Sequence, residues 1–242
     1  DAGDHMNAIS EHIYSKDKPD VLAHVRQLAD MIDERAAAHR AYRDSIPGLA
    51  AHPVPVAMDE WNYWYGDYIY GELGVRYHLK DALGVAEGLH AFFRNSDVYL
   101  MANYAQTVNV IGAIKTTRTA SALGATGLAL VLYRHHFGSI PVAVHGDTGS
   151  LDLSAAWTGD RKALTLAVVN PTPETKRLDL SVQGAALSGK AERWTLSGPD
   201  PELYNEPGKP QALVIQHQPV PPGAHTLEIP AYGIAIYRLE TE

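Results

Sequence analysis

The chain has 242 residues, 45% of them hydrophobic and 20% charged, so it can bury one large core or two modest ones. Its formal net charge is -8 with both signs interleaved, which argues against nucleic acid or an anionic membrane as a partner and favours a neutral ligand. Because there is no cysteine, a disulfide framework and thiolate metal sites are excluded, while the cellular compartment stays open.

The first 137 residues alternate strand-like and helix-like stretches, which predicts consecutive βα units around a parallel sheet. Three units are predicted, each a strand followed by a helix: 8–14 with 20–40, 54–58 with 80–95, and 98–103 with 120–137. Aspartate is a preferred N-cap residue, so Asp20 is expected to cap the first of these helices. Glu60 falls where the second strand is expected to end and give way to a tyrosine-rich loop. The helix of this second unit should bury one face, formed by Leu83, Ala86, Leu89, His90 and Phe93.

From Ser139 onward, short alternating runs are separated by Gly, Pro, Asp and Asn, which predicts an antiparallel β-sandwich. The predicted strands cover residues 151–157, 163–169, 176–182, 193–196, 213–216, 226–229 and 234–239. The proline-rich segments 170–173 and 219–223 are expected to be turns. We therefore expect two domains, 1–138 built from βα units and 139–242 built from strands.

The βα part is incomplete as a fold. Three units cannot close a barrel of eight strands, and a parallel sheet left open exposes apolar faces and an unpaired edge. We expect the missing strands to come from another polypeptide or from a longer precursor. The chain alone should then be aggregation-prone or partly unfolded.

One motif stands out, the sequence Asp-Glu-Trp-Asn-Tyr-Trp-Tyr at residues 59–65. It sets a carboxylate at the end of an apolar strand and follows it with aromatic rings, an arrangement typical of sites that cleave sugars. In a barrel of parallel strands the carboxyl end of each strand carries the chemistry. Asp59 is the neighbour of Glu60 in the strand, so its side chain should point to the opposite face.

Over this motif and over residues 81–98, 102–111 and 133–138, the chain resembles the α-L-arabinofuranosidases of glycoside hydrolase family 51. The resemblance spans nearly the whole chain and is to the C-terminal part of these enzymes. It implies a (β/α)₈ barrel followed by a β-sandwich of jelly-roll type, with the three units here as barrel units six to eight.

The resemblance also implies an activity, the removal of terminal α-L-arabinofuranosyl residues from arabinoxylan or arabinan with retention of configuration. Glu60 matches the catalytic nucleophile of the family. The acid/base of the family is the Glu of a Gly-Asn-Glu-like motif after barrel strand four, and this sequence has no such motif. We therefore expect the acid/base to lie in an N-terminal part absent from this chain, and the chain alone to be inactive.

The remaining candidate residues are sugar-binding. By resemblance Tyr14 orients the nucleophile and touches the sugar, with His12 beside it, and Gln106 binds arabinose hydroxyls from a segment that begins at Asn103. Two tryptophans offer faces for sugar C–H groups, and of these Trp64 is favoured over Trp61 as the ring beside the leaving-group sugar. The tyrosines at 63, 65, 68 and 70 either extend this surface or pack between subunits.

Neither a metal nor a cofactor is expected. Neighbouring residues on a helix point about 100° apart, so His135 and His136 do not form a metal site without a third ligand. The partners that the resemblance implies are an arabinose-containing oligosaccharide or polysaccharide, the N-terminal half of the barrel, and further copies in a homo-oligomer such as a hexamer. Two alternatives remain: an endo-acting glucanase or xylanase of the same family, and a non-catalytic carbohydrate-binding or structural fragment.

Overall fold

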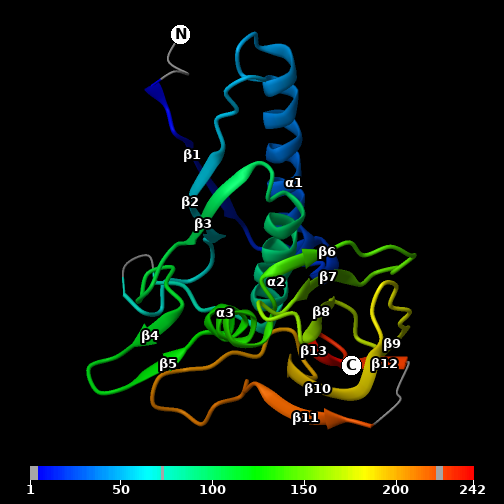
Figure 1. The fold of residues 1–242 in the computed structure, drawn as a ribbon. Helices are drawn as coiled ribbons and strands as arrows, with labels where there is room; N and C mark the ends of the chain where they lie inside the picture. The colour runs from blue at the N-terminus through cyan, green and yellow to red at the C-terminus, as the bar shows by residue number, and fades with distance from the viewer. Residues whose placement is uncertain (1–4, 72–73, 222–225) are drawn as a thin grey trace.

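The computed structural model describes residues 5–71, 74–221 and 226–242, and it begins with three βα units. These are β1 (Ile9–Ser15) with α1 (Val21–Ser45), β2 (Val56–Tyr63) with α2 (Leu79–Arg94), and β3 (Tyr99–Tyr104) with α3 (Ala125–His136). The three strands form a parallel sheet in the order β1-β2-β3, with α1 and α2 to one side of it (Figure 1). The three predicted units are therefore confirmed.

Helix α1 begins where the sequence predicts. The Asp20 side chain accepts a hydrogen bond from the N–H of Ala23 at 2.7 Å, which satisfies one of the free amides of the first turn. The buried residues Val25, Leu28 and Ile32 follow at helical spacing. The helix continues to Ser45, five residues beyond the predicted end.

Helix α2 differs from its prediction in burial. Instead of one apolar face, nearly all of it is buried, including Lys80, Asp81 and Glu87, while Leu89 and Phe93 of the predicted face are only partly buried. The reason is its position, because α2 packs at once against α1, α3 and the strands β7 (Asp152–Trp157), β8 (Ala163–Asn170) and β13 (Gly233–Thr241). A helix surrounded in this way has no solvent face to keep polar.

Helix α3 starts five residues later than predicted. The preceding segment forms a small hairpin, β4 (Ile114–Thr116) with β5 (Ser121–Leu123), which the sequence pattern did not indicate. The apolar run 128–132 lies in α3, within the helix predicted over 120–137.

The second part of the chain is a β-sandwich. Six antiparallel strands form one sheet in the order β11-β10-β13-β8-β7-β6, and β12-β9 form a two-stranded sheet. Their bounds are β6 (Ile140–Val142), β7 (Asp152–Trp157), β8 (Ala163–Asn170), β9 (Lys176–Asp179), β10 (Leu187–Ser197), β11 (Gln216–Val220), β12 (Thr226–Ile229) and β13 (Gly233–Thr241). Several details correct the prediction. Strand β6 was not expected, β9 ends three residues early, and β10 begins six residues early. The strand predicted at 213–216 is instead β11 at 216–220, which lies over part of the predicted turn.

Strand β8 is buried on both faces, and its two faces serve different cores. Leu166 and Val168 pack with residues of β12, inside the sandwich. Ala167 and Val169 join the core that the helices of the βα part also line. The sandwich and the βα units therefore share a hydrophobic core, and a division at residue 138 remains a prediction from sequence.

The sandwich also contacts both ends of α2. At the N-terminus, the N–H groups of Leu79 and Lys80 donate to the carbonyls of Leu203 and Pro201, at 2.8 and 2.9 Å. At the C-terminal end, the side chains of His90 and Arg94 contact Asp152 on β7. Helix α2 is thus held by the β-sandwich at each end.

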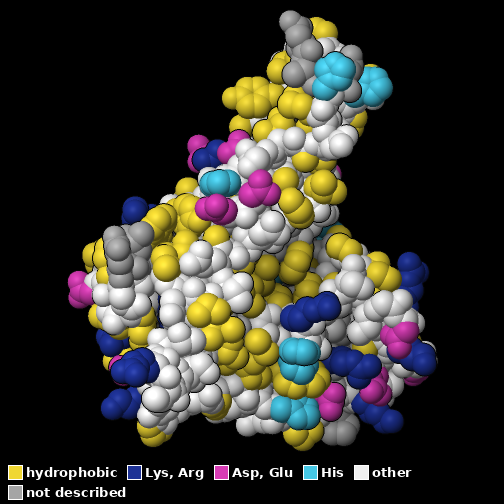
Figure 2. All heavy atoms as spheres, turned by 90° about the vertical axis from the view of Figure 1, so that its left-hand side faces the viewer, with side chains coloured by type: hydrophobic (Ala, Val, Ile, Leu, Met, Phe, Trp, Pro, Cys, Tyr) yellow, Lys and Arg dark blue, Asp and Glu magenta, His cyan; other side chains and the backbone are white. Residues whose placement is uncertain are grey.

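The opposite face of the parallel sheet is open. Figure 2 shows this side of the molecule, where hydrophobic side chains gather on the narrow upper part and around a hollow near the middle. Leu100 and Met101, on the edge strand β3, are 64% and 44% exposed. Among the described helices, none is long and apolar enough to cross a membrane.

Candidate active site

Glu60 lies within β2, on the side of the sheet away from the helices. The prediction that the strand ends at Glu60 is corrected, because β2 continues to Tyr63. The register between β1 and β2 shifts here, pairing Glu11 with Met58 but His12 with Glu60. Asp59 is the extra residue of this irregularity, and its carboxylate accepts a hydrogen bond from Ser10 Oγ at 2.6 Å.

Tyr14 is the direct partner of Glu60. Its hydroxyl donates to Glu60 Oε2 at 2.5 Å, across two neighbouring strands. Burial raises the pKa of Tyr14, and the hydrogen bond to Glu60 and the charge of Glu60 raise it further. The hydroxyl therefore keeps its proton and serves as a fixed donor to the carboxylate.

His12 lies beside the same oxygen. Its Nδ1 is 3.7 Å from Glu60 Oε2, and the side chains of His12 and Glu60 are 49% and 45% exposed. The structure thus brings together three of the residues singled out in the sequence and leaves the carboxylate accessible from the open face of the sheet.

The two tryptophans of the motif have different surroundings. Trp64 packs its ring edgewise against Tyr14, with ring centroids 5.3 Å apart. Trp61 is 1% exposed and packs against Phe92 of α2 and against Tyr104. Because side chains alternate along a strand, Trp61 lies on the helix side and Glu60 on the other. The structure does not bring Trp61 to the predicted sugar-binding face.

Asn103 and Gln106 are both exposed, the first on β3 and the second in the loop that follows. No hydrogen bond joins either to Glu60 within the described part of the chain. This loop is held by Asn62, a fully buried residue that the sequence reading did not single out. The Nδ2 of Asn62 donates to the carbonyls of Ala105 and Ile111, at 2.5 and 2.7 Å.

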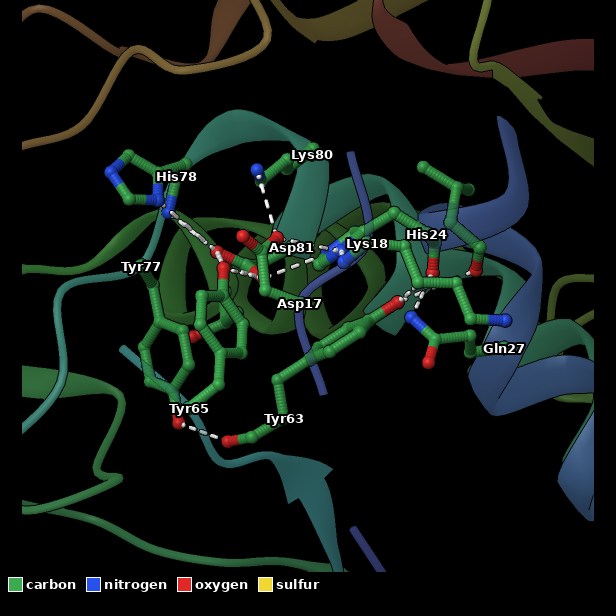
Figure 3. Close-up of polar contacts among 12 residues, drawn as sticks. Asp17, Lys18, His24, Gln27, Tyr63, Tyr65, Tyr77, His78, Lys80 and Asp81 are labelled. Atoms are coloured by element: carbon green, nitrogen blue, oxygen red, sulfur yellow. Dashed lines mark hydrogen bonds and ion pairs between the residues drawn. The ribbon is translucent and has the colours of Figure 1, made fainter. Parts of the chain in front are cut away.

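Behind the sheet lies a buried polar cluster that sequence reasoning also missed (Figure 3). At its centre is Asp81, which accepts hydrogen bonds from the Tyr65 hydroxyl at 2.6 Å and from the N–H of His78 at 2.7 Å. The Nε2 of His24 is 3.0 Å from the same carboxylate. His24 and Asp81 are 57 residues apart, so only the folded structure reveals that they meet.

The tyrosines at 63 and 65 belong to this cluster, which corrects the expectation that they form part of a sugar-binding or intersubunit surface. Tyr63 is fully buried, stacks on the His24 ring at 4.6 Å and donates to the His24 carbonyl at 2.8 Å. Burial raises the pKa of both phenols, and the charge of Asp81 adds to the effect. Tyr68, by contrast, is exposed.

In the described ranges, no three His, Asp or Glu side chains are arranged to hold a metal ion. The rings of His135 and His136 are 6.2 Å apart. What the Glu60 site offers is an accessible carboxylate with one oxygen fixed by a tyrosine. Such a group can act as a nucleophile or as an acceptor for a ligand hydroxyl.

Solved structures of arabinofuranosidases share this fold. An α-L-arabinofuranosidase from Thermotoga maritima, solved as an arabinose complex, matches 99% of the chain with a TM-score of 0.88 and 26% identity. A GH51 arabinofuranosidase from Xanthomonas axonopodis pv. citri also matches 99% of the chain, with a TM-score of 0.79 and 26% identity. The chain covers 54% of each of these two.

A family model described as the alpha-L-arabinofuranosidase C-terminal domain matches residues 59–232. The chain therefore belongs to the α-L-arabinofuranosidases of glycoside hydrolase family 51, and it corresponds to their C-terminal part. A curated relative, a probable α-L-arabinofuranosidase C of Aspergillus flavus, is 31% identical over 193 residues, and the match covers 72% of this chain. The chain spans 37% of the length of that protein.

The fold is shared more widely than the sequence. CelM2, a bifunctional glucanase-xylanase from a metagenome library, matches 98% of the chain with a TM-score of 0.68 at 18% identity, and the chain covers 44% of it. Similarity at this level is one of fold alone.

Proposed function

We propose that this chain carries the nucleophile of a retaining glycoside hydrolase that removes terminal α-L-arabinofuranosyl residues from arabinoxylan- or arabinan-type hemicellulose. The observation that supports this most directly is the hydrogen bond from Tyr14 to Glu60 Oε2. It fixes one carboxylate oxygen, and the other has no hydrogen-bond partner among the described residues. Glu60 Oε1 is then the atom that attacks the anomeric carbon.

The reaction needs a second carboxyl group. A retaining enzyme places its two carboxyl groups about 5 to 5.5 Å apart, one forming the glycosyl-enzyme bond and one protonating the leaving oxygen. Water then attacks the anomeric carbon, gives its proton to the second carboxylate and releases Glu60. In our proposal the second carboxyl comes from N-terminal barrel units, in a longer precursor or a separate chain, which cover the open sheet face. Without them the chain does not turn over substrate.

Two further parts of the proposal concern the sugar and the assembly. Trp64, His12, Gln106 and Asn103 are proposed to bind the substrate, with His12 beside Glu60 and Trp64 packed against Tyr14. The complete enzyme is proposed to form a homo-oligomer such as a hexamer. An endo-glucanase or xylanase activity is the alternative, and products released from arabinoxylan and from β-glucan separate the two.

The test is made on Glu60, in the enzyme assembled with its N-terminal barrel units. Glu60→Ala should lower the hydrolysis of an aryl α-L-arabinofuranoside by at least about a thousand-fold. Added azide should restore aryl release and give an arabinofuranosyl azide of inverted configuration, because a small anion fits where the carboxylate was. The matched control is Asp59→Asn, the adjacent carboxylate that is bonded to Ser10. Normal turnover by Glu60→Ala would sink the assignment.

A further inference from the structure

Trp64 lies between Tyr63 and Tyr65, whose hydroxyls are both hydrogen-bonded within the buried polar cluster behind the sheet. The hydroxyl of Tyr63 donates to the carbonyl of His24 on α1, at 2.8 Å. The hydroxyl of Tyr65 donates to Asp81 on α2, at 2.6 Å. Figure 3 shows both phenol rings leading from the end of β2 into this cluster. The backbone is therefore fixed on either side of Trp64.

The contacts of Asp81 hold the Tyr65 hydroxyl firmly in place. It is fully buried and is bonded by donors from three separate elements: the Tyr65 hydroxyl, the His78 N–H at the start of α2, and His24 Nε2 of α1. A buried carboxylate that loses a donor is left with an unsatisfied charge in a medium that cannot solvate it. Moving Tyr65 would remove a donor from the buried Asp81 carboxylate, and this free-energy cost keeps Tyr65 in place.

The indole ring of Trp64 makes few directional contacts of its own. Its indole Nε1 is buried and has no hydrogen-bond partner among the described residues. Its backbone N–H donates to the carbonyl of Ser15 on β1 at 2.9 Å. The orientation of the ring therefore follows from the backbone on either side and from its edgewise contact with Tyr14.

We propose that Tyr63 and Tyr65 are positioning residues that hold the Trp64 ring at the sugar-binding site. Neither phenol touches Glu60 or the open face, so each acts through the backbone of Trp64. The ring then sets how firmly the leaving-group side of the substrate is bound. This role rests on the proposed function of the Glu60 site.

The test compares two Tyr→Phe changes in the complete enzyme. Tyr65→Phe removes the hydroxyl that binds Asp81 and keeps the ring. Tyr99→Phe is the matched control, because Tyr99 is also buried and its hydroxyl donates to the carbonyl of Ile32 on α1, away from Trp64. The first readout is the ¹⁹F resonance of Trp64 in enzyme labelled with 5-fluorotryptophan, assigned from Trp64→Phe. The second is KM and kcat for an arabino-oligosaccharide.

We expect Tyr65→Phe to shift or broaden the Trp64 resonance and to raise KM by about three- to ten-fold, the size of one lost hydrogen bond. The kcat should stay within about two-fold, because Tyr14 and Glu60 are untouched. Tyr99→Phe should leave the resonance and KM unchanged. A merely structural loss would reduce the amount of active enzyme and hence kcat.

Two results would overturn the inference: an unchanged Trp64 resonance with an unchanged KM in Tyr65→Phe, or equal effects in Tyr99→Phe. If Tyr65→Phe does not fold, Tyr63→Phe gives the same comparison, since it loses the bonds to the main-chain carbonyls of His24 and Val25 on α1. Failure of the proposed function is seen separately, because it would appear as full activity in Glu60→Ala. The position of Trp64 is judged from its resonance whatever the activity.

Discussion

Tyr14 and Glu60 lie on neighbouring parallel strands but are not register partners, and the hydroxyl of Tyr14 crosses diagonally to Glu60 Oε2. In the register, Glu60 faces His12 and Tyr14 faces Asn62. The diagonal contact leaves His12 beside the carboxylate without a direct hydrogen bond at 3.7 Å. One oxygen of Glu60 is thereby held by a neutral donor, which orients the group without a fixed positive charge.

Removing this donor should impair catalysis more than folding. In the complete enzyme, Tyr14→Phe is expected to lower kcat/KM for an aryl arabinofuranoside by about 10- to 100-fold, because a hydrogen bond to a charged group contributes about 1.5–3 kcal/mol. The melting temperature should change little. Tyr99→Phe serves as the control, and equal activity of the two variants would contradict a role for the Tyr14 hydroxyl.

Substitutions of the two tryptophans of the motif should have different effects, one on stability and the other on substrate binding. Trp61→Ala is expected to destabilise the fold by about 3–5 kcal/mol, since it empties a filled place between the sheet and α2. Trp64→Ala should cost less stability and should raise KM. Denaturant titration measures the first effect and steady-state kinetics the second. A larger loss of stability in Trp64→Ala than in Trp61→Ala would show that these assignments are reversed.

Glu87 makes stability depend on pH. Burial, and then the nearby charge of Asp152, raises the pKa of Glu87 to about 8. Its Oε1 is buried without a partner among the described residues. The unfolded chain releases this proton near the ordinary pKa of 4.5, whereas the folded chain keeps it. The protonated Glu87 therefore contributes to the free energy of unfolding in full below pH 4.5. This contribution falls by about 1.4 kcal/mol per pH unit as the pH rises to about 8.

Glu87→Gln should remove that dependence. The amide is neutral at every pH, so the variant is expected to gain stability relative to the parent as the pH rises from 5 to 8. Thermal melts across this range measure the difference. Glu34→Gln, an exposed position on α1, is the control and should follow the parent curve. Parallel curves for Glu87→Gln and the parent would show that Glu87 is ionised in the folded state throughout.

The shared core predicts that the βα units and the sandwich melt together. His90 is fully buried and contacts both Asp152 of β7 and the hydroxyl of Tyr133 on α3. Asp152→Ala should therefore destabilise the fold by about 2–4 kcal/mol and move one transition as a whole. Scanning calorimetry is the measurement, with the exposed Asp44→Ala as control. Two separate transitions would refute a common core.

Local patterns in the sequence were sufficient for the βα units. The spacing of Val25, Leu28 and Ile32 and the capping Asp20 are properties of neighbouring residues, and the structure follows them closely. The errors have two causes. The hairpin β4–β5 is too short to show a hydrophobic period, and β10 is lengthened by pairing with β13, which is distant in the sequence.

Some residues of the candidate site could likewise be identified from the sequence, and others could not. Glu60, Tyr14 and Trp64 could be selected because a strand end and a motif mark them. Trp61 was assigned to the wrong face because β2 runs on past Glu60, so that position 61 alternates inward. The polar roles of Asn62, His24 and Asp81 were missed, because main partners of each lie far away in the sequence, up to 57 residues apart.

The two sandwich carbonyls that accept from Leu79 and Lys80 limit where this chain can be recombined with others. A chimera joined at residue 138, with a foreign sandwich, would leave both amides of α2 without acceptors unless the donor sandwich carried an equivalent turn. Retaining residues 199–205 of this chain would keep those bonds. A practical crossover point for engineering hybrid hydrolases therefore lies inside the sandwich and not at the change of sequence pattern.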